Sequence, residues 1–445
     1  MTLAGKTDNG GQAMRATARE IFAHALAESR IESGFSRNLD CERGILRAGG
    51  ERYDLAAFSR LLVVSFGKGA HTSLEALQAR LDVPVQLAGI VSAPTPPAAP
   101  VAGFDYFTGG HPMPNPDSLR AAAAILRALE SLDERALVLY LISGGGSAIV
   151  ERPIAAGITL DDLIETYRAL VHSGAPIAEI NTVRKHLSAV KGGRMARAAA
   201  PARQLSILIS DVPDNSLDAL ASGPTMPDSS TIDQCYELAR QYDLLPQLPA
   251  SVRALFAGRQ IEETPKSGDS FFTRSHWQTV LSNLSAREAA RQRAVAAGFA
   301  VEVDNTCDDW DYRRAADYLL GRVRALRRED PRICLISGGE VTVTVNTRPG
   351  TGGRNQQFAL YCAERIRDEN LCVFSAGTDG IDGNSPAAGA VADGTTSARA
   401  REKGLSAAAA LESFDAYPLF SALGDAIVTG PTGTNVRDLR LLFAW

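Results

Sequence analysis

The run Leu61-Leu-Val-Val-Ser-Phe-Gly-Lys-Gly69 decides the fold class, because an apolar stretch without alternation stops abruptly at glycine. Such a run is typical of a strand that is buried on both faces of a parallel sheet. Four more runs share this pattern and span residues 137–144, 205–211, 333–338 and 371–377. Ala-, Leu- and Arg-rich stretches between them predict helices at Met14–Ala27, Asp117–Leu132, Ala286–Ala297 and Ala315–Arg327. Strands that alternate with helices indicate layered α/β domains.

The chain is long enough for more than one domain, and its composition changes near the middle. Residues 247–269 are polar and contain proline, which is typical of a linker. We therefore predict two α/β domains, residues 12–260 and 261–445, with the boundary between 247 and 280. In the second domain, Val341-Thr-Val-Thr-Val345 alternates with period two, which predicts a half-exposed strand at a sheet edge.

Composition excludes several classes of protein. The net charge is −5, from 46 basic and 51 acidic side chains, so a nucleic-acid or anionic-membrane partner is disfavoured. The six cysteines form no C-x-x-C pair, and no apolar run reaches the ~18–20 residues that cross a bilayer. These features predict a soluble, cytoplasmic protein with small-molecule partners.

One of the two strongest candidates for ligand binding follows the second apolar run. Ser143, Gly144, Gly145, Gly146 and Ser147 stand in a row there. Glycines let backbone N–H groups approach an anion, so this loop predicts a phosphate or carboxylate site, although an ordinary tight turn would read the same way. The chain has neither the Walker A pattern nor a complete G-x-G-x-x-G pattern.

Two more loops lie at predicted strand ends. Lys68, between Gly67 and Gly69, could reach a phosphoryl group in transfer, or be a solvated surface lysine. Asp211 and Asp214 could bind a metal or accept a hydroxyl proton, or belong to an acidic turn.

Other candidate residues are cationic or lie in the second domain. Arg184, Lys185 and Lys191 could neutralise a carboxylate or triphosphate, or form a solvated helix face. Glycines before a helix indicate an anion site that contains Gly352, Gly353, Arg354 and Asn355. An oxygen-rich loop predicts a metal or ribose site that contains Thr378, Asp379 and Asp382.

Two candidates are less specific. Asn435 belongs to a last Gly-rich segment that is either a ligand loop or a turn. His111 invites a role as general base, but the prolines around it favour a rigid loop and a helix cap. Together the loops predict a polyanionic ligand, and phosphoryl transfer is favoured over hydride transfer.

The chain resembles the class II glycerate 2-kinases, and its C-terminal third resembles their MOFRL domain. The likeness runs in order from about Arg15 to Phe443, and eight motifs carry it: Ser65–Ala70, Gly110–Pro114, Leu141–Ser147, Asn181–Leu187, Ser210–Pro213, Ala221–Thr225, Gly352–Gln356 and Gly377–Gly383. Some bacterial members of the family carry a hydroxypyruvate reductase label from tartrate degradation.

The resemblance implies ATP-dependent phosphorylation of D-glycerate to 2-phosphoglycerate with Mg²⁺. It implies a larger domain with a mostly parallel Rossmann-like sheet, a second domain with a mixed sheet, and an active site in the cleft between them. The family's proposed catalytic lysine and arginine correspond to Lys68 and Arg354.

From these assignments we predict that Asp211 or Asp214 orients or deprotonates the C2 hydroxyl of glycerate. We also predict that Asp379, Asp382 or Asp211 holds Mg²⁺. Replacing Lys68 or Arg354 by alanine should abolish most turnover and leave melting nearly unchanged. The alternatives are an NAD(P)H-dependent hydroxypyruvate reductase and a non-catalytic binding protein. We expect a monomer or a homodimer.

Overall fold

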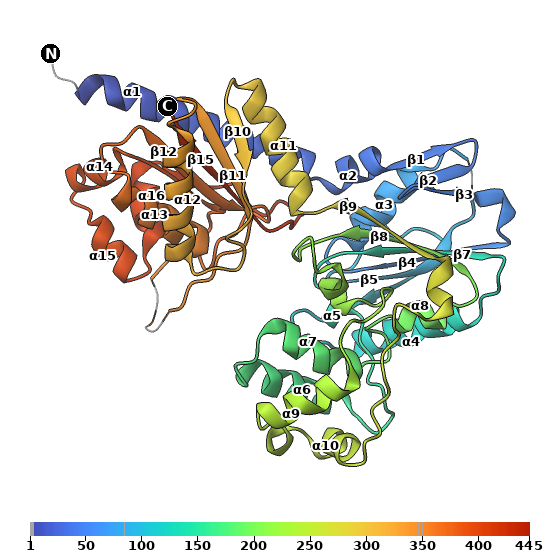
Figure 1. The fold of residues 1–445 in the computed structure, drawn as a ribbon. Helices are drawn as coiled ribbons and strands as arrows, with labels where there is room; N and C mark the ends of the chain where they lie inside the picture. The colour runs from blue at the N-terminus through green and yellow to red at the C-terminus, as the bar shows by residue number, and fades with distance from the viewer. Residues whose placement is uncertain (1–3, 84, 346–347, 349) are drawn as a thin grey trace. The chain divides into compact units, whose positions relative to one another are not determined.

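The computed structural model describes residues 4–83, 85–345, 348 and 350–445. The chain forms two compact units, each described by itself below (Figure 1). The larger unit contains residues 34–280, and the smaller unit contains residues up to 33 together with 281–445. The observed division differs from the expected one, because residues 12–33 pack with the C-terminal part of the chain. Packing of an apolar helix face against a distant sheet cannot be read from local composition.

The larger unit is built on a six-stranded sheet in the order β6-β5-β4-β7-β8-β9. The pairs β6–β5, β5–β4, β4–β7 and β7–β8 are all parallel. This confirms the predicted parallel sheet. The strands are β4 (Arg60–Phe66), β5 (Ala88–Ala93), β6 (Phe104–Thr108), β7 (Ala136–Ile142), β8 (Arg203–Ile209) and β9 (Ser275–Leu281).

The connectivity of this sheet places a natural ligand position beside β4. The chain enters at β4, continues outward through β5 and β6, and then returns to form β7 on the other side of β4. Loops after β4 and β7 therefore leave the sheet in opposite directions. Such a switch point leaves a crevice beyond the carboxyl ends of the two strands, where ligands collect in open α/β sheets.

Helices cover both the sheet and a neighbouring helical region of the larger unit. Helix α3 contacts β4 and β5, and α4 contacts β5 and β6. A separate apolar cluster, including Leu163, Leu170 and Val252, joins α6, α7, α9 and α10. The helices are α2 (Ile31–Asn38), α3 (Ala70–Arg80), α4 (Pro116–Glu130), α5 (Gly146–Ile149), α6 (Leu160–His172), α7 (Ile177–His186), α8 (Arg194–Ala198), α9 (Ile232–Gln241) and α10 (Ala250–Ala257).

Short elements complete the larger unit. An antiparallel sheet of three short strands lies near its N-terminus. These strands and the 3₁₀ turns are β1 (Leu39–Glu42), β2 (Ile45–Ala48), β3 (Glu51–Asp54), η1 (Leu55–Ala57), η2 (Leu217–Ser222), η3 (Leu245–Gln247) and η4 (Ser270–Arg274).

The smaller unit contains a mixed sheet in the order β10-β11-β15-β12-β13-β14. Only β10 and β11 pair in parallel, and the last strand of the chain, β15, lies between β11 and β12. This confirms the expected mixed sheet. The strands are β10 (Ala300–Val303), β11 (Ile333–Gly339), β12 (Leu371–Gly377), β13 (Gly389–Asp393), β14 (Ala426–Ile427) and β15 (Asp438–Ala444).

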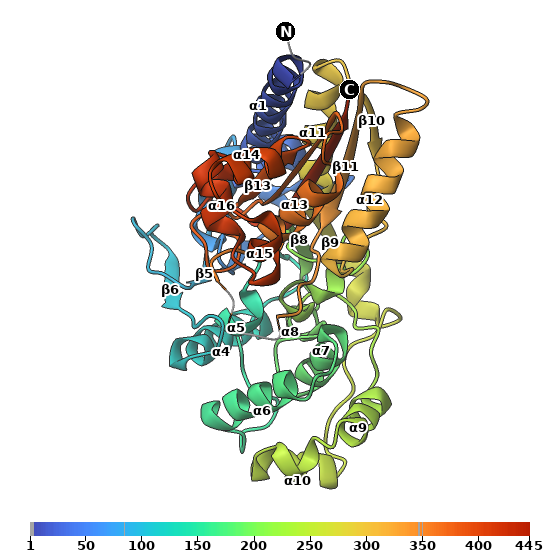
Figure 2. The ribbon, with the colours of Figure 1, turned by 90° about the vertical axis from the view of Figure 1, so that its left-hand side faces the viewer.

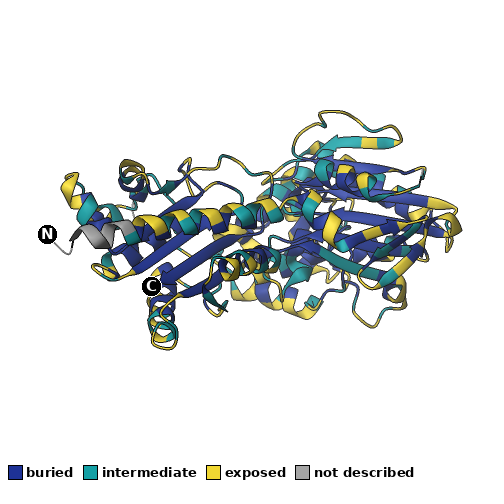
Figure 3. Cartoon of the chain, turned by 90° about the horizontal axis from the view of Figure 1, so that it is seen from above, coloured by how far each residue is buried: buried dark blue, intermediate teal, exposed yellow. Residues whose placement is uncertain are grey.

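Both faces of the mixed sheet are buried under helices, which explains its unbroken apolar runs. Cys334 and Ile336 face the helix pair α1 and α11, whereas Ile333 and Leu335 face α12 and α13. Figure 2 shows these helices around the sheet, and Figure 3 shows the buried strands. The helices are α1 (Ala4–Glu28), α11 (Asn283–Ala296), α12 (Tyr312–Leu326), α13 (Arg354–Arg365), α14 (Thr396–Glu402), α15 (Ala407–Glu412) and α16 (Ala416–Leu423).

The segment Val341–Val345 differs from its prediction. It forms no strand, and among the described residues its one ladder contact is an isolated bridge between Thr342 and Asp311. The alternation of residue types is not matched by exposure, because Val341 is buried, Val343 is half-buried and Val345 is exposed, although all three would lie on one face of a strand. Without a partner strand, alternating residues line a surface instead of joining a sheet.

No helix in the described part of the chain combines the length and apolarity needed to cross a membrane.

Candidate functional site

The loops after β4 and β7 meet at the switch point of the parallel sheet. The backbone N–H of Lys68 donates to the carbonyl of Gly144 over 2.9 Å, and the N–H of Gly69 donates to Ser143 Oγ over 2.9 Å. These bonds tie the lysine loop to the glycine loop. The Lys68 side chain is exposed, and none of the described residues forms an ion pair with it.

Glycine is required in these loops by close contacts. A Cβ atom on Gly144 would lie 2.0 Å from Asp211 Oδ2, and one on Gly67 would lie 2.3 Å from Ser143 Oγ. Gly145 has φ +82°, a left-handed conformation that favours glycine. The three loops after β4, β7 and β8 therefore pack closely, with the Asp211 carboxylate against the glycine loop. Asp214 lies farther along the same turn and is exposed.

The glycine loop is also held from its other side. Helix α5 begins at Gly146, and Ser147 Oγ lies 2.9 Å from Ser222 Oγ. The carbonyl of Ser222 accepts the N–H of Gly192 over 3.0 Å, immediately after Lys191. Residues from three motifs, near 145, 192 and 222, thus form one connected structure.

His111 joins this group, although its sequence context favoured a rigid loop. A Cβ on Gly145 would lie 3.0 Å from His111 Cδ2 and 3.2 Å from Lys68 Cγ. Burial and the nearby Lys68 charge lower the pKa of His111, which favours a neutral imidazole at pH 7. The cap was also foreseen correctly, because Asn115 caps α4. The position of His111 after β6, a strand of the same sheet, was the available signal.

The predicted cations behave differently from Lys68. Lys185 is buried and donates to Asp218 over 3.0 Å and to Asp228 over 3.1 Å. Lys191 is buried against Glu151, and burial lowers the pKa of Lys191. In this structure the charges of both lysines are therefore already compensated by carboxylates.

Arg184 lies over an aromatic ring. Its guanidinium carbon is 4.6 Å from the centre of the Tyr167 ring. Burial lowers the pKa of Arg184, and Tyr167 partly offsets this effect. The stacked arrangement is a favourable cation–π contact. We find no direct link from Arg184 to the glycine loop among the contacts of the described residues.

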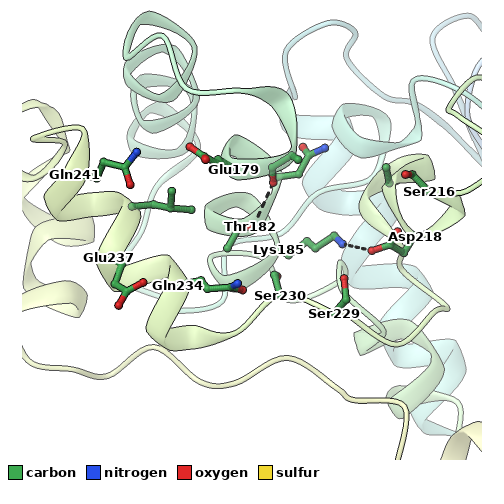
Figure 4. A pocket seen from close by; sticks show the side chains of 14 residues that line it. Glu179, Thr182, Lys185, Ser216, Asp218, Ser229, Ser230, Gln234, Glu237 and Gln241 are labelled. Carbon is green, nitrogen blue, oxygen red and sulfur yellow. Dashed lines mark hydrogen bonds and ion pairs between the residues drawn. The ribbon is translucent and has the colours of Figure 1, made fainter. Parts of the chain in front are cut away.

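A cavity of about 430 Å³ lies beside Lys185, between α7, α9 and the η2 segment (Figure 4). Its wall contains Glu179, Asp218 and Glu237, and Lys185 points toward Asp218. The carboxylates outnumber the single lysine, so the lining as a whole disfavours an anion.

In the smaller unit, Arg354 begins helix α13 and is held by carboxylates. Its Nε lies 2.6 Å from Asp438 Oδ2, and its Nη2 lies 3.0 Å from Asp438 Oδ1. The same Nη2 lies 2.9 Å from Glu340 Oε1. Burial alone would lower the pKa of Arg354, but the bond to Asp438 and the surrounding carboxylates raise it. The guanidinium is thus permanently charged and already paired.

The Asp382 carboxylate accepts hydrogen bonds from the N–H groups at the start of α13, where the sequence predicted a bound anion. It accepts the N–H of Asn355 over 3.0 Å and that of Gln356 over 2.9 Å. A Cβ on Gly353 would lie 2.3 Å from Asp382 Oδ1, which explains the glycine. Burial raises the pKa of Asp382 to about 6, although these hydrogen bonds oppose the rise. Asp382 therefore acts as the cap of α13.

This arrangement does not favour Asp382 as a metal ligand, because N–H donors already engage both of its oxygens. Within the described ranges, no group of three or more His, Cys, Asp or Glu is arranged to hold a metal ion. Asp379, unlike Asp382, does not cap the helix. It lines a cavity of about 590 Å³ together with Asp309, Glu340 and Arg354.

The remaining predicted residues support turns. Thr378 Oγ1 donates to the carbonyl of Arg437 over 2.7 Å and accepts the N–H of Val436 over 2.8 Å. Asn435 Oδ1 accepts the N–H of Arg437 over 2.9 Å. The N–H of Gly352 donates to Asn384 Oδ1 over 2.9 Å. These contacts position the loops around Arg354 and Asp438.

The fold and the site define a class: a two-unit α/β protein with a lysine and a glycine loop at the switch point of a parallel sheet. A family model described as a domain of unknown function (DUF4147) matches residues 17–257, and the MOFRL family matches residues 333–438.

Relatives and a solved structure agree with these matches. A D-glycerate 2-kinase of Thermotoga maritima is 34% identical over 85% of this chain and 89% of its own length. A putative hydroxypyruvate reductase of Agrobacterium vitis is 37% identical over 86% and 87% of the two chains. A crystal structure of glycerate kinase from T. maritima superposes with a TM-score of 0.82 at 30% identity, covering 98% of this chain and all of that one. The chain belongs to the DUF4147–MOFRL family of glycerate kinases.

Proposed function

We propose that this chain is a glycerate 2-kinase, which transfers the terminal phosphate of ATP to the C2 hydroxyl of D-glycerate. The observation that carries the proposal is the set of groups at the sheet switch point. Lys68, Asp211 and the 143–147 loop come from three neighbouring strands and pack against one another. The named activities of the relatives support the same reaction.

Each group has a task that its position supports. Lys68 has no carboxylate partner among the described residues, so its charge can stabilise negative charge on the phosphoryl group. Asp211 orients the substrate hydroxyl and accepts its proton. Arg354 supplies a second positive charge from the smaller unit, where Asp438 fixes the direction of its guanidinium group.

The 590 Å³ cavity of the smaller unit suits a phosphate chain that carries a divalent cation. Its wall combines Arg354 with the carboxylates of Asp309, Glu340, Asp379 and Asp382, which outnumber the single arginine, so the phosphate chain fits here only together with its divalent cation. Mg²⁺ usually binds one or two carboxylates together with substrate phosphates, and we assign Asp379 to this role instead of Asp382. When bound, the ion would neutralise phosphate charge.

The direct test is a reaction of the purified full-length chain with ATP, Mg²⁺ and D-glycerate. We expect ADP release that depends on glycerate, and a ³¹P and ¹³C NMR spectrum of 2-phosphoglycerate. Phosphate at C3, or ADP release that is unaffected by glycerate, would contradict the proposal. L-glycerate serves as the stereochemical control.

The name of the Agrobacterium relative favours a second candidate, reduction of hydroxypyruvate. It would require NADH, and the chain lacks the full G-x-G-x-x-G pattern after a strand. Hydroxypyruvate-dependent loss of absorbance at 340 nm with NADH would support the reductase, and a flat trace would remove it.

We place the kinase reaction in the cytoplasm. All six cysteines are free and buried, which suits a reducing compartment. The acidic net charge agrees with small-molecule substrates instead of nucleic acid.

A further inference from the structure

A second cavity of the smaller unit is unlike the charged one beside it. It measures about 280 Å³, and its wall includes Val343, Val345 and Phe414. Gly352 and Gly353 contribute backbone without side chains, which leaves room for a flat group. Apolar walls with a few polar groups are typical of small-molecule sites.

The apolar walls of this cavity are left open to solvent. Val345 is 40% exposed, and Phe414 and Val343 are partly exposed. Phe414 also has φ +52°, a left-handed conformation that is costly for a bulky residue. Residues in such conformations cluster at ligand sites, where the surrounding structure maintains them.

The apolar cavity and the 590 Å³ charged cavity adjoin each other. Arg354 and Gly383 line both of them. A single ligand can therefore place an apolar part against Val343, Val345 and Phe414 and an anionic part beside Arg354. The two cavities together match a molecule with one flat apolar end and one charged end.

We infer that the 280 Å³ cavity holds the adenine ring of ATP, with the phosphates in the adjoining charged cavity. This inference rests on the proposed function, since it assigns one of the two substrates. Glycerate has three carbons that carry a carboxylate and hydroxyls, so it has no flat apolar group for Phe414 or the valines. The smaller unit is therefore the nucleotide-binding unit, and the switch point of the larger unit takes glycerate.

The test measures nucleotide binding, separately from turnover. Titration calorimetry on the full-length chain compares Mg·ADP with adenosine, which shares only the base and the sugar. Phe414→Asn removes the ring at a left-handed position that asparagine tolerates, so this variant should melt no lower than the wild type. Val345→Ser removes a partly exposed apolar wall.

We expect Phe414→Asn to weaken both ligands about tenfold, in line with the loss of a stacking contact. Val345→Ser should weaken both ligands about threefold, because it removes a smaller apolar contact. Equal factors for ADP and adenosine are expected because the base is common to both. Val295→Ser on α11 is the matched control, since Val295 is 49% exposed and lies outside the cavity.

Three outcomes would overturn the inference: wild-type affinity for ADP in both variants, weaker binding of ADP but not of adenosine, or no competition by adenosine at millimolar concentration. Failure here with glycerate phosphorylation intact would remove only the adenine site. ADP binding that responds as expected without glycerate phosphorylation would instead remove the proposed reaction.

Discussion

Lys68 and Arg354 are the two cations assigned to phosphoryl transfer, but the two units hold them in opposite ways. Lys68 lies on a glycine loop, is exposed and has no carboxylate partner among the described residues. Arg354 starts a helix and is bound in a bidentate pair with Asp438, which is 1% exposed, and by Glu340. The lysine can move toward its target, whereas the arginine is fixed in direction before any ligand arrives.

The Arg354–Asp438 pair changes the prediction for melting, because both alanine variants were expected to melt like the wild type. Only Lys68 fits the expectation of unchanged melting, because its side chain has no ion-pair partner among the described residues. Removing Arg354 would leave a buried carboxylate unpaired. Catalytic and structural roles are therefore separate at Lys68 and combined at Arg354.

The largest expected effect is the loss of turnover in Lys68→Ala. We expect kcat to fall about 10³-fold, the size of effect seen when one group that stabilises transition-state charge is lost. Melting should not change, as measured by calorimetry. Lys403→Ala, at an exposed lysine of the smaller unit, is the control. Turnover within threefold of the wild type would remove Lys68 from the mechanism.

Arg354→Ala should lower both activity and stability. We expect about a 10²-fold loss in kcat and a free energy of unfolding lower by about 1–3 kcal/mol, since the partly exposed arginine leaves Asp438 buried without a partner. Arg354→Ala/Asp438→Asn should recover the stability but not the turnover. If the double variant stayed as unstable as the single one, Asp438 would not explain the loss.

The smallest expected effect concerns stability and pH at Asp382. Its pKa is raised from 3.8 to about 6 by burial, so the folded state binds this proton more tightly than the unfolded state. The stabilisation that comes from proton binding at Asp382 is therefore fully present below pH 3.8 and lost as pH rises through 6, whereas the hydrogen bonds that its carboxylate accepts remain at pH 7.

The variant Asp382→Asn tests this cap. An amide presents N–H to the N–H groups of Asn355 or Gln356, so we expect a loss of about 1–3 kcal/mol in urea unfolding at pH 7. Part of the pH dependence between 4 and 7 should disappear. Asp379→Asn, at the other aspartate of this loop, should stay within about 0.5 kcal/mol of the wild type. Equal losses in both variants would contradict the cap.

The sequence predicted what depends on local pattern. Apolar runs such as Leu61–Gly67 and Leu371–Gly377 became the buried strands β4 and β12, because strands covered on both faces need unbroken apolar residues. Glycines at strand ends marked the loops correctly. Gly144, for example, can lie against the Asp211 carboxylate because glycine has no Cβ atom.

Ion pairs and hydrogen bonds between residues far apart in the sequence could not be predicted. Lys185 and Lys191 looked like ligand cations, but Asp218, Asp228 and Glu151 come from other segments of the chain. Val341–Val345 has the alternation of a strand, but the pattern carries no information on whether a partner strand exists. The role of Asp382 as a helix cap depends on a contact across 26 residues.

The position of β15 has a consequence for the order in which the chain can fold during synthesis. Residues 438–444 form the middle of the mixed sheet, between β11 and β12, and α1 packs on that sheet from the opposite end of the sequence. The mixed sheet therefore cannot be completed until residues 438–444 have been synthesised, whereas residues 34–280 are complete much earlier. Until then the apolar face of α1 can pack against α11 but not against the finished sheet, so we expect part of this face to be open to a holding chaperone.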